Sequence, residues 1–178
     1  GLIRQGIKAL MEEIENADPR LYEEMGGKKI ADKKEKVHTL MPEEKKKKLV
    51  EVVEEARALK GKAEELESPS VKQKIEQLNR ILNENTEEKN GEVQKKKDHV
   101  KDKLVSLVDK DARHGAKSDK KTFTGYKANV MKSEDGFVTN IETTPGNTYD
   151  GDVLLPLVDE MTSNGYKPEK VVGDTHYG

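Results

Sequence analysis

Apolar residues in the first 82 positions recur at the spacing of amphipathic helices. The first stripe predicts a helix over about 2–16, which ends before Asp18-Pro19. A second helix, about 43–67, begins near Pro42, and Ser68-Pro69-Ser70 separates it from a third over about 70–83. The apolar positions of the second and third stripes are Leu49, Val52, Val53, Ala56, Leu59, Ala63, Leu66, Val71, Ile75, Leu78, Ile81 and Leu82. Two such seams joined by a short loop predict an elongated helical hairpin or coiled coil within residues 1–92.

The polarity of the chain changes after this helical region. Residues 83–97 are polar and lack an apolar stripe, which predicts a loose connection. We interpret 93–121 as a basic linker, because its lysines and arginine number 10 against 5 aspartates.

From residue 122 the hydrophobic period changes from that of helices to that of strands. Residues 122–132 and 137–144 alternate in polarity, and the Ser133–Gly136 turn between them predicts an antiparallel hairpin. Asp150 is placed to N-cap a helix over about 151–163. Val171-Val172-Gly173-Asp174 then predicts a short strand that carries a carboxylate at its end. The expected fold class is therefore α+β, with a helical region followed by a partial α/β domain over 122–178.

Composition narrows the possible classes of protein. Charged residues make up 38% of the chain, mean hydropathy is −0.94, and the net charge is −2. No apolar run approaches the ~20 residues of a membrane span, and Gly1-Leu2-Ile3-Arg4 does not open a signal peptide. The absence of cysteine excludes disulfides and thiolate metal sites. We expect a cytoplasmic protein without a membrane partner.

Four short motifs in the second half stand in a fixed order. They are Asp109-x-Asp111-Ala112-Arg113-His114-Gly115-x-Lys117-Ser118, Phe123-x-Gly125-Tyr126-Lys127, Thr144-Pro145-Gly146-Asn147-x-x-Asp150 and Gly173-Asp174-x-x-Tyr177. Together they resemble the central part of bacterial insertion-sequence transposases, which are DDE enzymes with a ribonuclease H-like catalytic domain. The resemblance covers residues 109–178, and the helical region is similar to an insert that some members carry. Lys110 and Thr175-His176 depart from the usual residues of the family.

The resemblance implies DNA transposition by metal-dependent phosphodiester cleavage and strand transfer. Such enzymes hold two Mg²⁺ or Mn²⁺ ions with two aspartates and a glutamate, and Asp174 would be the second aspartate, a catalytic residue and metal ligand. The first aspartate is then expected upstream of Gly1 and the glutamate beyond Gly178, so the chain alone is expected to be inactive. The implied partners are transposon-end DNA and, in the full-length protein, further copies of the same chain.

Basic residues near the motifs are candidates for DNA contacts, because phosphate binding needs clustered cations rather than a fixed geometry. The candidates are Arg113, Lys117, Lys120, Lys121 and Lys127. Lys45–Lys48 is more typical of a solvated helix face. The alternative to a transposase fragment is a non-catalytic nucleic-acid-binding protein or a coiled-coil interaction protein, in which Asp174 has no catalytic role.

Overall fold

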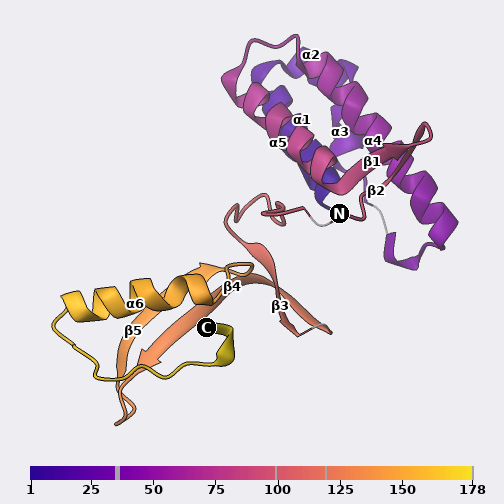
Figure 1. Cartoon of the computed structure of the whole chain (residues 1–178). Helices are drawn as coiled ribbons and strands as arrows, with labels where there is room; N and C mark the ends of the chain where they lie inside the picture. Colours follow the sequence, from indigo (N-terminus) through magenta and orange to yellow (C-terminus); the bar gives the residue numbers. More distant parts are fainter. Residues whose placement is uncertain (35–36, 99, 119, 178) are drawn as a thin grey trace. The chain divides into compact units, whose positions relative to one another are not determined.

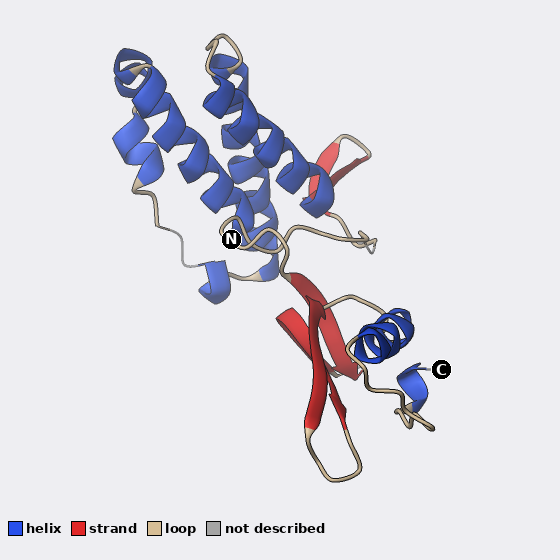
Figure 2. Ribbon diagram, turned by 90° about the vertical axis from the view of Figure 1, so that its left-hand side faces the viewer, coloured by secondary structure: helices blue, strands red, loops and turns tan. Residues whose placement is uncertain are grey.

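A computed structural model describes residues 1–34, 37–98, 100–118 and 120–177, without the side chain of residue 176. The chain divides into two compact units, which are Gly1–Leu107 and Val108–Gly178. We call them the helical unit and the sheet unit and describe each by itself (Figures 1 and 2). Helices dominate the first and antiparallel strands the second, which confirms the α+β class. No described helix has the length and apolar character needed to cross a membrane.

The helical unit begins with helix α1 and continues through short helices to two long ones. The bounds are α1 Leu2–Ala17, α2 Pro19–Glu24, α3 Gly27–Ala31, the 3-10 turn η1 Val37–Thr39, α4 Pro42–Ala63 and α5 Pro69–Asn85. Asp18 separates α1 from α2, because its Oδ1 accepts hydrogen bonds from the backbone N–H groups of Arg20 and Leu21, both at 3.0 Å. All three helices predicted from the stripes are present, within a few residues of the expected bounds.

The apolar stripes of α1, α4 and α5 meet in one core. Each of these helices contacts the other two. The largest fully buried side chains are Ile7, Leu10, Met11, Ile14, Val53, Val71, Leu78, Ile81 and Leu104. One buried charge lies at the border of this core, where the Arg4 guanidinium binds the Glu55 carboxylate at 2.8 Å. Lys33 binds the same carboxylate at 3.2 Å.

The prediction of a loose connection over residues 83–97 is wrong. Helix α5 extends to Asn85, and strands β1 (Thr86–Lys89) and β2 (Glu92–Lys95) then form an antiparallel hairpin. Asn90 and Gly91 have positive φ values of 54° and 77°, as a tight two-residue turn requires. The Asn-Gly signal was present in the sequence, but the flanking strands are charged and carry no apolar alternation.

The sheet unit contains three antiparallel strands in the order β3-β4-β5, which are Arg113–Ser118, Lys121–Lys132 and Val138–Pro145. Strands β4 and β5 confirm the predicted hairpin. Strand β3 lies within the stretch predicted as a basic linker, and it forms by pairing with the first part of β4. Gly115 of β3 is required by packing, because a Cβ there would clash with the Gly146 carbonyl and the Phe123 ring.

Helix α6 spans Gly151–Ser163, which are the predicted bounds, and packs against β5 through a buried stripe of Val153, Leu157 and Met161. The predicted strand at Val171–Asp174 is wrong. These residues are irregular, and a one-turn 3-10 helix, η2, follows at Thr175–Tyr177. A strand needs a neighbouring strand to satisfy its backbone groups, and none of the described strands pairs with these residues.

Candidate active site

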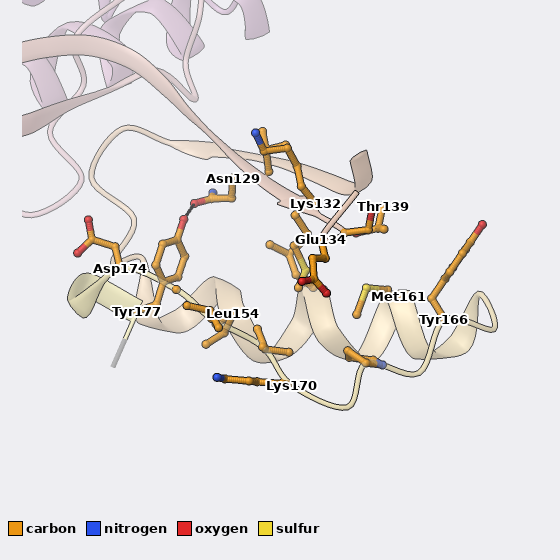
Figure 3. A pocket seen from close by; sticks show the side chains of 18 of the residues that line it. Asn129, Lys132, Glu134, Thr139, Leu154, Met161, Tyr166, Lys170, Asp174 and Tyr177 are labelled. Atoms are coloured by element: carbon orange, nitrogen blue, oxygen red, sulfur yellow. Dashed lines mark hydrogen bonds between the residues drawn. The ribbon is translucent and has the colours of Figure 1, made fainter. Parts of the chain in front are cut away.

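Asp174 lies at the end of the irregular segment that returns from α6 to the sheet (Figure 3). Its carboxylate is exposed, and the Thr175 hydroxyl donates to its Oδ1 at 3.1 Å. The backbone N–H of Tyr177 donates to the Asp174 carbonyl at 2.9 Å, which closes the η2 turn. The turn therefore presents an accessible carboxylate on a short, hydrogen-bonded piece of backbone.

Tyr177 connects this turn to the middle of the sheet. Its hydroxyl donates to Oδ1 of Asn129 in β4 at 2.8 Å, as the dashed line in Figure 3 shows. Asn129 is only 3% exposed, and its amide nitrogen lies 3.4 Å from the Thr144 hydroxyl of β5. The turn that carries Asp174 is thus joined by a side-chain hydrogen bond to two strands of the sheet.

Two cavities meet at Asn129, Asp174 and Tyr177. The first, of about 560 Å³, lies between β4, α6 and the returning segment. The second, of about 580 Å³, is lined by those three residues and also by Lys117, Lys127, Asp150 and part of β4. The second cavity is therefore lined by an exposed carboxylate and by two predicted DNA-binding lysines.

Lys127 is held inside the sheet unit by two hydrogen bonds. Its ammonium contacts the Asp150 carboxylate at 2.8 Å and the Thr148 carbonyl at 2.9 Å, and both charged side chains are about one-quarter exposed. This ion pair changes the role predicted for Asp150. Asp150 occupies the N-cap position of α6, but its side chain makes no capping hydrogen bond and binds Lys127 instead.

Three other predicted DNA-binding residues gather at the end of the β3–β4 hairpin. Lys117, Lys120 and Lys121 are all exposed there, and we call these three residues the lysine tip. Arg113, at the start of β3, is half-buried, and its Nη1 donates to the carbonyls of Lys110 and Ala112. The structure therefore separates an accessible cationic tip from two cations engaged in local contacts.

Comparison with known proteins identifies the family. The family described as "Transposase DDE domain" matches residues 86–178, which is more than half of the chain. The chain belongs to this family. No curated protein and no solved structure gives a significant match. The match runs from β1 to the turn that carries Asp174, and membership indicates a role in transposition.

The transposase domain also contains a hydrogen-bonded pair that sequence reasoning did not identify. The Tyr126 hydroxyl donates to Asp109 Oδ1 at 2.6 Å, and the same oxygen accepts from the backbone N–H groups of Asp111 and Ala112. The bond from Tyr126 holds the pKa of Asp109 below its usual value, and that carboxylate raises the pKa of Tyr126 to about 12. In the sequence, the only indication of this pair is that Asp109 and Tyr126 each lie in one of the four motifs.

The donor atoms of the transposase domain fit one part of a divalent-cation site. Mg²⁺ prefers oxygen ligands and is commonly held by one or two carboxylates together with water and substrate phosphate oxygens. The exposed Asp174 carboxylate meets the requirement for a single such ligand. Among the described residues, no group of three histidine, aspartate or glutamate side chains is arranged to hold a metal ion.

Proposed function

We propose that this transposase domain takes part in DNA cleavage and strand transfer, with Asp174 as a catalytic, metal-holding carboxylate. One observation carries the proposal: Asp174 lines the same cavity as Lys117, which belongs to the exposed lysine tip. A scissile phosphodiester needs both an anionic metal ligand and cationic contacts to the neighbouring phosphates. The domain offers the two kinds of group at one place.

Asp174 and the lysine tip would have separate roles in the reaction. Asp174 would hold one or both of two Mg²⁺ or Mn²⁺ ions against the scissile phosphate, together with carboxylates from outside the described cavity. When bound, such ions neutralise charge on the non-bridging oxygens and activate a water or a 3′-hydroxyl as nucleophile. The lysine tip would bind phosphates of the transposon end and orient the strand along the cavity wall.

Arg113 and Lys127 are also proposed to lie near the DNA, but unlike the lysine tip both are engaged in local contacts. Lys127 neutralises Asp150 next to the cavity, so it lowers the repulsion that an approaching phosphate would meet. Arg113 is positioned by two carbonyls at the base of the β3–β4 hairpin. The proposed setting is the bacterial cytoplasm, with the transposase acting as a homo-oligomer on two DNA ends.

The test is the substitution Asp174→Asn in a transposase polypeptide that supplies all three carboxylates. The change is nearly isosteric but removes the negative charge that holds a divalent cation. We expect Mg²⁺- or Mn²⁺-dependent nicking of transposon-end DNA and strand transfer to be lost, while folding and DNA binding stay nearly unchanged.

Asp159→Asn is the matched control, because Asp159 is an exposed carboxylate on α6 that lines neither cavity. It makes the same change in charge and should nick at the wild-type rate. If the Asp174→Asn protein nicks as fast as this control, Asp174 is not a metal ligand, and a non-catalytic DNA-binding role becomes the better explanation.

A further inference from the structure

The position of Asp174 depends on a segment without regular secondary structure. Residues 167–174 form neither helix nor strand in the described chain, and only the short η2 turn follows. A carboxylate that holds a metal ion at a reacting phosphate must keep its place to within a fraction of an ångström. Some contact to a rigid element is therefore required to hold this carboxylate during the reaction.

The hydrogen bond between Tyr177 and Asn129 supplies such a contact. The Tyr177 N–H closes the turn onto the Asp174 carbonyl at 2.9 Å, so the two residues share one compact backbone unit. The Tyr177 hydroxyl then reaches Asn129 at 2.8 Å, 48 positions away in the sequence. Figure 3 shows the tyrosine side chain extending from the turn to the amide on β4.

Asn129 is suited to be the fixed end of this link. It lies in β4, which hydrogen-bonds to β3 and β5 and is therefore the central strand of the sheet. Its side chain is buried, and its amide faces the Thr144 hydroxyl on β5, so its orientation is restricted from both sides. A buried amide strongly favours keeping its hydrogen-bond partners, because an unpaired one loses its solvation without compensation.

We propose that Asn129 and Tyr177 are positioning residues for the proposed metal ligand: their hydrogen bond holds the Asp174 turn against the sheet. The proposal rests on the proposed function of Asp174. It assigns no chemistry to the tyrosine, whose hydroxyl is engaged with the amide. The consequence is that loss of one hydroxyl, which binds Asn129 and is not itself a metal ligand, weakens metal-dependent activity.

The experiment compares Tyr177→Phe with Tyr166→Phe in the polypeptide that supplies all three carboxylates. Tyr166 is 61% exposed and immediately precedes residues 167–174, and its substitution likewise removes one tyrosine hydroxyl. We expect Tyr177→Phe to raise the Mg²⁺ concentration for half-maximal nicking on the order of five- to tenfold, the equivalent of one lost hydrogen bond. Tyr166→Phe should leave this concentration unchanged, and DNA affinity should be the same in both.

Two further variants separate positioning from a general loosening of the sheet. Asn129→Leu should raise the Mg²⁺ requirement like Tyr177→Phe, and the double variant should be no worse than either single one, because both remove the same bond. Thr144→Val keeps the tyrosine bond and removes only the longer 3.4 Å contact of Asn129, so its effect should be smaller than that of Tyr177→Phe. Additive effects, or an equal effect of Thr144→Val, would overturn the proposal.

Amide hydrogen exchange provides a readout that does not depend on catalysis. Tyr177→Phe should accelerate exchange of the Tyr177 amide, which closes the Asp174 turn, while exchange across β4 and β5 stays unchanged. Unchanged exchange at the turn overturns the positioning role, whatever the activity of Asp174. Conversely, faster exchange at the turn combined with an active Asp174→Asn protein would refute the proposed function and leave the structural link standing.

Discussion

The lysine tip provides the most direct test of how this domain would engage DNA. Replacing Lys117, Lys120 and Lys121 with alanine removes three exposed cations from the end of the β3–β4 hairpin. None of these three lysines forms an ion pair with an aspartate or glutamate that the structure describes. Their charge is therefore available to phosphate. We expect the triple variant to bind duplex DNA more weakly and with a lower dependence on salt.

The size of this effect follows from counterion release. Each neutralised phosphate contributes ~0.9 to the slope of log K against log salt, so three lost contacts flatten the slope by about 2.7. The same relation lowers the affinity by roughly a hundredfold at ~0.15 M salt when each lysine meets one phosphate. Lys127 is excluded from this calculation, because its ammonium is neutralised by Asp150.

The assay is a fluorescence-anisotropy titration of labelled duplex DNA at several salt concentrations. The matched control replaces Lys45, Lys46 and Lys47, three exposed lysines of α4, with alanine. This control changes the net charge by the same amount as the tip variant. If the surface that binds DNA is the lysine tip, only the tip variant should lose slope. Equal losses in the two variants would mean that binding follows total charge, and an unchanged slope in the tip variant would refute the proposed contacts.

Two further predictions concern the helical unit. Leu10→Ala should destabilise the protein by about 2–5 kcal/mol in urea denaturation, because this side chain is fully buried. Met41→Ala, at a 68% exposed position, should have little effect. Similar losses of stability in the two variants would contradict the assigned core. For Glu55, burial raises its pKa, but hydrogen bonds from Arg4 and Lys33 outweigh burial, so the folded pKa is below the unfolded value. Its ionised form therefore stabilises the fold above the unfolded pKa of ~4.3, and this stabilisation is lost as pH falls through the folded pKa. Glu55→Gln should accordingly be less stable than wild type at pH near 7, and the difference in stability should shrink below pH ~4. A difference in stability that does not change with pH would refute this role. An equal effect of Glu54→Gln, at an exposed position, would refute it as well.

Local patterns were sufficient where an element depends mainly on its own residues. The apolar stripe at Val153, Leu154, Leu157, Val158 and Met161 predicted α6 with its observed bounds, and the Ser133–Gly136 turn predicted the β4–β5 hairpin. Asp174 was also found from the sequence, through its place in an ordered set of motifs that the family match includes. Its role as a metal ligand stays a prediction.

Contacts between distant residues were decided only by the tertiary structure. Strand β3 forms because it pairs with β4, although its own sequence predicts part of a basic linker. Residues 171–174 have strand-forming side chains yet remain irregular, because none of the described strands pairs with them. Lys127 binds Asp150, and Tyr177 binds Asn129, across 23 and 48 positions. Periodicity along a chain encodes which face of an element is buried, but the partner of a polar side chain depends on which distant backbone the fold brings within hydrogen-bonding distance.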